Sequence, residues 1–249
     1  MPTSEKGFLF ELFTSVQGEG LWTGCVQHFV RLAGCHVECA YCDTIDARKR
    51  VACFESPWPD QGEINNPVGV SQALDLVRAL EQATPKAQAL AVTGGEPLEQ
   101  VEFLSLFLPC VKREIFKDRP VLLETAGLHA DAMQRLVNDV DMVSMDIKLA
   151  SVSGLKDTAA RHKDFLEVLR KGGFYVKTVV NSETPLSEVL EAARLIAEKD
   201  AAANLFLQPE TRQGKPVTGE YLIRCWETAR EYVENVRIQP QLHRLLDIR

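Results

Sequence analysis

The stretch Gly34-Cys35-His36-Val37-Glu38-Cys39-Ala40-Tyr41-Cys42-Asp43-Thr44 places three cysteines within eight residues, in the spacing C-x3-C-x2-C. The chain holds seven cysteines among 249 residues. Two more cysteines at fixed offsets from any one of them would then occur by chance with a probability of about half a per cent. The spacing therefore indicates a ligand site.

Thiolates suit zinc, copper(I) or iron–sulfur clusters. Structural zinc takes four closed ligands, usually as two separated pairs, and no second cysteine pair follows here. Cys35, Cys39 and Cys42 can instead hold three irons of a [4Fe–4S] cluster, which leaves the fourth iron open to a ligand that is not protein. A small structural metal site or a chance grouping stays as the alternative.

The composition is that of a soluble globular chain, with 45% hydrophobic and 25% charged residues. A net charge of −7 argues against a general nucleic-acid binder, which needs a basic face. The first residues lack the apolar run of a signal peptide, and no apolar stretch is long enough to span a bilayer. The odd cysteine count, with no paired framework, suggests a reducing compartment, so we expect a cytoplasmic protein without a membrane partner.

Strand-like and helix-like segments alternate along most of the chain, which predicts a parallel α/β sheet. Strands are expected over 7–16, 28–33, 87–92, 120–124, 140–147, 174–180, 203–207 and 236–239, and helices over 70–83, 99–117, 129–138, 157–171, 184–199 and 217–234. Ser71 is the expected N-cap of the first helix. Residues 45–69 contain Pro57, Pro59 and Pro67 and predict an irregular surface insertion. No interdomain linker is visible, so residues 1–249 are expected to form one domain.

Polar motifs follow several of these strands, at the edge where ligands bind in open sheets and barrels. They are Gln17-Gly18-Glu19-Gly20, Thr93-Gly94-Gly95-Glu96-Pro97, Asp146-Ile147-Lys148 and Gln208-Pro209-Glu210-Thr211. Each taken alone could be an ordinary turn or ion pair. Arg31 lies inside a predicted buried strand and needs an anion, either a protein carboxylate or a ligand carboxylate.

The cysteine spacing, with an aromatic residue before the last cysteine and Gly94-Gly95-Glu96-Pro97 after the next strand, resembles the radical S-adenosylmethionine (SAM) superfamily. The resemblance implies an incomplete TIM-type βα barrel, a [4Fe–4S] cluster on Cys35, Cys39 and Cys42, and SAM on its open iron. The SAM contacts that it implies are Tyr41, Cys42, Asp43, Gly94, Gly95, Glu96, Asp146, Ile147, Lys148, Gln208, Pro209, Glu210 and Thr211.

Within the superfamily, Ser15-Val16-Gln17-Gly18-Glu19-Gly20, Phe29-Val30-Arg31-Leu32 and Cys42-Asp43-Thr44 resemble the 7-carboxy-7-deazaguanine synthase family, and the likeness runs from about residue 8 to the end. The resemblance implies ring contraction of 6-carboxy-5,6,7,8-tetrahydropterin to 7-carboxy-7-deazaguanine with loss of ammonia, as in queuosine and deazapurine synthesis. It implies substrate contacts at Val16, Gln17, Gly18, Glu19, Arg31, Thr93, His243 and Arg249, and a Mg²⁺ ligand at Thr44.

The resemblance further implies a homodimer reduced by a flavodoxin- or ferredoxin-type donor. The C-terminal tail of the chain, residues 236–249, is expected to close the site. Two departures stand out: the segment after Thr44 lacks the family's usual aromatic residues, and Arg249 stands where many members end in proline. The alternatives are an activase that places a glycyl radical on a partner protein, and a non-catalytic metal-binding module.

Overall fold

The computed structural model describes residues 6–58, 62–211 and 217–248. Its centre is an eight-stranded sheet with the order β12-β11-β10-β9-β8-β7-β3-β2. The strands are β2 (Leu9–Val16), β3 (Val26–Leu32), β7 (Ala89–Gly94), β8 (Val121–Thr125), β9 (Met142–Asp146), β10 (Phe174–Val180), β11 (Asn204–Pro209) and β12 (Asn235–Ile238). All neighbours pair in parallel except β2 and β3. Within the described residues the edge strands β2 and β12 do not meet, so the sheet forms the partial barrel that the sequence predicts.

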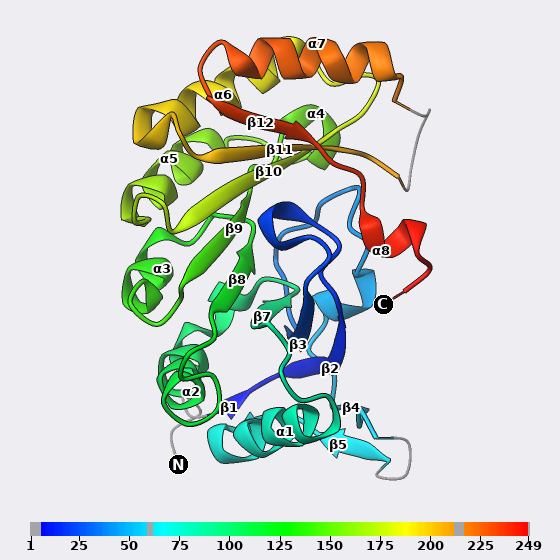
Figure 1. The fold of residues 1–249 in the computed structure, drawn as a ribbon, viewed down its shortest axis with the longest axis vertical. Coiled ribbons are helices and arrows are strands. Elements are labelled where there is room, and N and C mark those ends of the chain that lie inside the picture. The colour runs from blue at the N-terminus through cyan, green and yellow to red at the C-terminus, as the bar shows by residue number, and fades with distance from the viewer. Residues whose placement is uncertain (1–5, 59–61, 212–216, 249) are drawn as a thin grey trace.

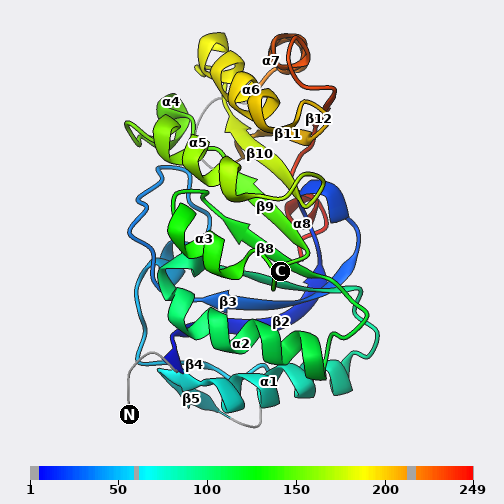
Figure 2. The ribbon, with the colours of Figure 1, turned by 90° about the vertical axis from the view of Figure 1, so that its left-hand side faces the viewer.

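Helices cover the outer face of the curved sheet, and its inner face is turned toward the C-terminal segment (Figures 1 and 2). They are α1 (Val70–Ala83), α2 (Val101–Glu114), α3 (Ala130–Leu136), the short α4 (Ala150–Ser153), α5 (Ala159–Val168), α6 (Leu186–Asp200), α7 (Gly219–Arg230) and, on the other side, α8 (Leu242–Leu245). Helix α1 buries Leu74, Val77 and Leu80 as its spacing predicts. The N-cap prediction is wrong: Gly69 precedes the helix, and Ser71 lies inside its first turn without a capping bond.

Side chains on the inner face of the barrel form two successive layers. The first, which we call the inner plug, is the apolar cluster of Phe13, Phe29, Ala91, Leu122, Tyr175 and Phe206. The second, which we call the polar wall, lies two residues along the same strands and consists of Glu11, Arg31, Thr93, Glu124, Lys177 and Gln208, with Ser144 from β9. Because side chains two apart on a strand share a face, both layers point into the barrel.

Residues 45–69 are more regular than the sequence predicts. Residues Ile45–Arg48 form a 3₁₀ turn, β4 (Cys53–Glu55) pairs with β5 (Glu63–Asn65), and β6 (Val68–Gly69) pairs with β1 (Lys6–Gly7). Phe54 and Val68 are buried in the main core. The described part of this segment therefore contains short paired strands where the sequence predicts irregular structure, because Phe54 and Val68, on either side of the prolines, pack into the core. Most of its other residues are exposed or half-buried.

Across the described ranges, every helix is too short or too polar to cross a bilayer.

Candidate active site

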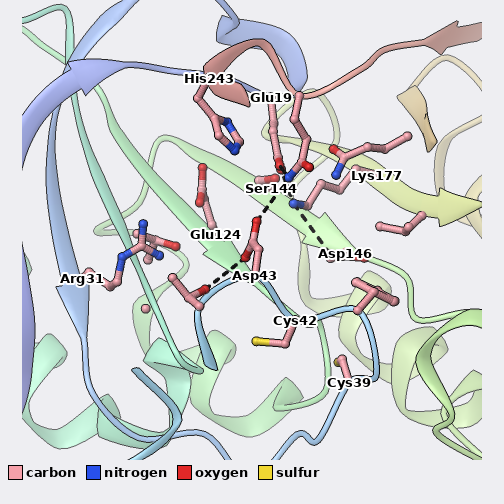
Figure 3. Close-up of a pocket in the computed structure, with 18 of the residues that line it drawn as sticks. Glu19, Arg31, Cys39, Cys42, Asp43, Glu124, Ser144, Asp146, Lys177 and His243 are labelled. Carbon is pink, nitrogen blue, oxygen red and sulfur yellow. Dashed lines mark hydrogen bonds and ion pairs between the residues drawn. The ribbon is translucent and has the colours of Figure 1, made fainter. Parts of the chain in front are cut away.

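A cavity of about 440 Å³ opens at the carboxyl ends of the parallel strands, and Phe13 and Phe29 of the inner plug line it. Figure 3 shows a close-up of this cavity with its lining side chains. Most of the residues that the sequence singles out line it: Val16, Gln17, Gly18, Glu19, Arg31, Cys35, Cys39, Tyr41, Cys42, Asp43, Thr44, Thr93, Gly94, Gly95, Asp146, Lys148, Gln208, Pro209, Glu210, Thr211 and His243. Glu96 and Ile147 are buried beside it and do not line it. Arg249 lies outside the described residues.

The three cysteines of the motif all face this cavity, and none of them forms a disulfide. Their loop is tied down by backbone bonds from Gly34 N to Ala47 O (2.8 Å) and from Cys35 N to Arg48 O (3.0 Å), and Arg48 also donates to the carbonyl of Cys39. The segment after the motif therefore fixes the backbone that presents the thiols.

The spread of the three sulfur atoms distinguishes between metals. Two thiolates on one zinc ion are at most about 4.6 Å apart, because each Zn–S bond is about 2.3 Å. Among the described residues, two groups of three ligand atoms lie within 4.8 Å of one another, and the three cysteines are neither of them. At least one pair of these sulfur atoms is therefore farther apart than two ligands of one zinc ion, which fits a cluster with several irons better than a single ion.

Burial raises the pKa of Cys35 to about 12; the bond to the Val37 carbonyl opposes this, and Glu96 and Glu99 add to it. Burial also raises the pKa of Cys39, although Lys148 and Arg48 oppose this. Both are therefore thiols at neutral pH when no metal is bound, and metal binding must release their protons.

The double glycine after β7 brings two loops into contact. A Cβ on Gly95 would lie 2.2 Å from the carbonyl oxygen of Gly34, and a Cβ on Gly94 would lie 2.4 Å from that of Leu32. Gly95 N donates to Leu32 O and Glu96 N to Gly34 O, each at 2.9 Å. The glycines are thus required for packing against the cysteine loop, in addition to any contact with a ligand.

Glu96 supports the cavity from behind and does not enter it. Its carboxylate accepts bonds from the Thr125 hydroxyl (2.7 Å), from Ala126 N (2.8 Å) and from Leu98 N (3.1 Å). Burial raises its pKa despite these bonds. Within the described residues, the hydrogen-bond partners of this side chain lie at the end of β8 and in the segments that follow β7 and β8, and the predicted cofactor contact of Glu96 stays a prediction.

Four charged side chains contact one another in series in the cavity, and three of them, Glu19, Asp146 and Lys177, are labelled in Figure 3. Lys148 Nζ lies 2.7 Å from Asp146 Oδ2, and Lys177 Nζ lies 3.7 Å from the same oxygen and contacts Glu19 closely. Tyr41 packs its ring 5.1 Å from Lys148 Nζ. Because two cations alternate with two carboxylates, the four side chains carry no net charge, and each charge has an opposite charge beside it.

Lys177 and Glu19 hold each other ionised. Burial opposes the charged form of Lys177, but Glu19 and Asp146 outweigh it and raise its pKa. Burial likewise opposes ionisation of Glu19, and Lys177 outweighs it and lowers the pKa. Asp146 Oδ1 is buried without a hydrogen-bond partner in the described part of the chain, so one strong acceptor remains for a ligand that fills the cavity.

The opposite side of the cavity carries two further polar pairs. Arg31 Nε donates to Glu11 Oε1 at 2.7 Å, and Gln17 Nε2 donates to Glu124 Oε1 at 2.8 Å. Of the two partners that the sequence leaves open for Arg31, the protein carboxylate is thus present. Arg31 nevertheless lines the cavity and remains partly exposed, at 17% of its side chain.

The C-terminal segment reaches over the same cavity. Leu242 N donates to Gly18 O at 2.9 Å, and a Cβ on Gly18 would lie 2.0 Å from His243 Nδ1. Gln241 donates to Glu19 Oε1 (2.6 Å) and to Asp43 Oδ2 (3.2 Å). Asp43 also accepts from the Thr44 hydroxyl at 3.1 Å. Glu19, Asp43 and His243 form one of the two close groups of potential metal ligands.

Sequence reasoning missed Glu124, Ser144 and Lys177, which belong to the polar wall. Each lies inside a strand, two residues beyond an apolar position that faces the barrel. A polar residue at an inward-facing position of an otherwise apolar buried strand is the sequence signal that could have identified them. Gln241 and Arg244 also line the cavity, but they lie in the tail and carry no such signal.

Comparison with known proteins gives concordant results. The model of the radical SAM superfamily matches residues 30–213. The chain is 36% identical to the 7-carboxy-7-deazaguanine synthase of Geobacter sulfurreducens, covering 96% of both chains, and 31% identical to that of Methanopyrus kandleri, covering 96% of this chain and 93% of the relative. Among solved structures, QueE from Escherichia coli aligns with a TM-score of 0.57 at 21% identity, covering 94% of both chains.

Proposed function

The chain belongs to the 7-carboxy-7-deazaguanine synthase family of the radical SAM superfamily, and we propose that it contracts the ring of 6-carboxy-5,6,7,8-tetrahydropterin to form 7-carboxy-7-deazaguanine and ammonia. The observation that carries the proposal is that the cysteine loop and the polar wall face one cavity. A radical generated at the loop would therefore reach a small substrate held at the wall. The activase alternative is not favoured, since the relatives are synthases.

We assign the cluster to Cys35, Cys39 and Cys42, which fit it by donor type and spread. When bound, the cluster supplies the electron that cleaves SAM to methionine and an adenosyl radical. The protein's part is to hold the ligands in register and to exclude water from the cavity. The apolar side chains of Val37, Ala126 and Leu128 pack around Cys39 and would keep the cluster dry.

The SAM side of the cavity is proposed to be the face made by Gly94, Gly95, Asp146, Lys148 and the segment from Gln208 to Thr211. The unpartnered Asp146 oxygen suits a ribose hydroxyl or an amino group. Tyr41 and Asp43 would contact the same ligand from the cysteine loop.

The pterin side is proposed to be Arg31, Thr93, Glu124 and the segment from Val16 to Glu19. Glu11 occupies Nε of Arg31, so a substrate carboxylate would pair with the two terminal guanidinium nitrogens. Glu124 has a carboxylate that can accept the adjacent N–H groups of the pterin's pyrimidine ring. His243, held against Gly18, would close this side together with the tail.

A Mg²⁺ ion is proposed beside Thr44. The Thr44 hydroxyl lies 3.1 Å from Asp43 Oδ1, and Asp43 lies with Glu19 and His243 in a close ligand group. Magnesium prefers oxygen ligands and keeps several waters, so the hydroxyl, the substrate carboxylate and waters would suffice. The ion would fix the carboxylate during rearrangement.

We further propose that the enzyme works in the cytoplasm as a homodimer, on a route to queuosine or another deazapurine. An acidic flavodoxin- or ferredoxin-type protein would deliver the electron, and Arg48, Lys49 and Arg50 give the segment behind the cysteine loop a local positive charge.

The test is an anaerobic assay of the cluster-loaded chain with the carboxypterin, SAM, Mg²⁺ and a strong reductant. We expect a deazaguanine product carrying one carboxylate, many turnovers per SAM, and ammonia equal to product. Cleavage of SAM without any conversion of the carboxypterin would contradict the substrate assignment. Intact SAM despite a reduced cluster would contradict the radical route itself.

A further inference from the structure

We propose that His36, Glu99 and His129 form a second metal site, for one divalent transition-metal ion of the zinc class, outside the cavity. His36 belongs to the cysteine loop, and Glu99 belongs to the 3₁₀ turn Pro97–Gln100 after β7. His129 is the residue directly before α3. None of the three lines the cavity that holds the cysteines. Glu99 and His129 line a separate hollow.

The geometry is close to that of a bound site. One potential ligand atom from each residue lies within 4.8 Å of the other two. His36 Nδ1 contacts Glu99 Oε1 directly, and the two imidazole rings are 5.0 Å apart at an angle of 74°. Two imidazoles and a carboxylate form a known three-ligand set for zinc, with water as the fourth ligand. Small rotamer changes would bring the three atoms onto one ion.

His129 supplies the independent observation. Its Nε2 atom is buried and has no hydrogen-bond partner within the described residues. Buried polar atoms are nearly always paired, so an unpaired ring nitrogen on a histidine of this group points to a missing partner. A simple hydrogen bond between His36 and Glu99 accounts for two of the residues and leaves His129 unexplained.

Neighbouring charges permit a cation here. Arg161 is the nearby opposing charge, and its guanidinium donates to the Leu128 carbonyl. Asp131 and Asp164 line the same hollow as Glu99 and offset that charge. The ligand types select the metal: imidazole nitrogen with one carboxylate suits zinc and its neighbours better than magnesium or calcium.

An ion at this position would connect the cysteine loop to the body of the barrel. His36 follows Cys35 directly, and its backbone N–H already donates to Glu99 Oε1 at 2.7 Å. The site would thus stiffen the start of the loop from its outer side. The inference does not depend on which substrate the cavity takes.

The test uses tag-free, full-length protein with its iron–sulfur cluster assembled, so that the cysteines are occupied, and zinc alone as the probe. Equilibrium dialysis should show one zinc per chain, and zinc-edge X-ray absorption should show nitrogen and oxygen ligands near 2.0–2.1 Å without sulfur near 2.3 Å. His36→Ala and His129→Ala should each weaken binding about tenfold or more. The exposed position of His36 makes the first variant safe for folding.

Two control variants decide where the ion sits. Asp131→Asn alters the charge of the same hollow and should leave zinc affinity within about twofold, since Asp131 is not a ligand. His243→Ala removes a member of the other close ligand group and should also leave zinc bound. Sulfur in the zinc shell, loss of zinc in His243→Ala, or unchanged binding in both His36→Ala and His129→Ala would overturn the proposal.

Discussion

The inner plug and the polar wall lie on the same strands, two residues apart, and they have opposite chemistry. Phe29, Leu122 and Tyr175 close the barrel interior with apolar side chains, whereas Arg31, Glu124 and Lys177 face the cavity from the next inward positions. The difference shows that one sheet serves two purposes along its length. One layer supplies folding free energy through burial, and the other lines the cavity in which we propose that the ligands bind.

The largest expected effect is a loss of activity from a change at the cysteine loop, with the packing of the inner plug unchanged. Cys39→Ser should prevent assembly of the complete cluster and abolish activity, because a serine hydroxyl is a poor ligand for the soft iron–sulfur unit. Iron and sulfide analysis after reconstitution measures the loss. The denaturation midpoint of the metal-free variant should match that of the metal-free parent; retained activity would contradict the assignment of the cluster ligands.

Truncating a side chain of the inner plug should have the converse effect, a loss of stability with activity retained. Phe206 is 1% exposed and meets Tyr175 edge to face at 5.4 Å. Phe206→Ala should lower the free energy of unfolding by about 3–5 kcal/mol, through lost burial and a cavity. Chemical denaturation measures this. At a temperature where the variant is folded, its activity should stay within a few-fold of the parent, and a selective loss of activity would argue against separable layers.

The next largest effect is expected from Lys177, in the polar wall. Lys177→Met leaves Glu19 and Asp146 without their shared cation, so the Glu19 side of the cavity should shift. We expect kcat/KM to fall about 100-fold, as is common when a positioning contact moves by about 1 Å. Lys177→Arg keeps the charge and should recover part of the rate; equal loss in both variants would favour a role that depends on the lysine's shape.

A pH titration of stability tests the support behind the wall. Burial lowers the pKa of His162 to about 4, against an ordinary value of 6.5, although its bond to the Ala126 carbonyl and the nearby Asp146 oppose this. Between pH 6.5 and about 4 the unfolded chain binds this proton more strongly than the folded chain does. The free energy of unfolding therefore decreases as the pH is lowered through this range, by up to about 3 kcal/mol from this group. His162→Gln should flatten that part of the curve, measured as the difference between the two proteins.

The smallest expected effect concerns the proposed magnesium ion. Thr44→Ala removes one neutral oxygen ligand and should raise the Mg²⁺ concentration for half-maximal activity about tenfold, with the cluster intact. Activity measured against Mg²⁺ concentration checks this, with iron content as the control. An unchanged Mg²⁺ response would show that Thr44 is not a ligand.

Local sequence was enough for the elements of the barrel and for the chemistry of the cysteine loop. The alternation of strands and helices predicted the parallel sheet, and the boundaries of α1 and β10 agree with the structure to the residue. Such features follow from short-range periodicity and from ligand types at fixed spacing, which are written in neighbouring residues.

Other features depended on which distant residues meet. The sequence could not show that Glu11 pairs with Arg31, that Glu96 faces the loop after β8, or that the 45–69 segment packs Phe54 into the core. Nor could it join His36, Glu99 and His129, which lie 63 and 30 residues apart along the chain. Strand order and curvature decide these contacts, because a side chain's partner is set by the whole fold and its own position fixes only the direction in which it points.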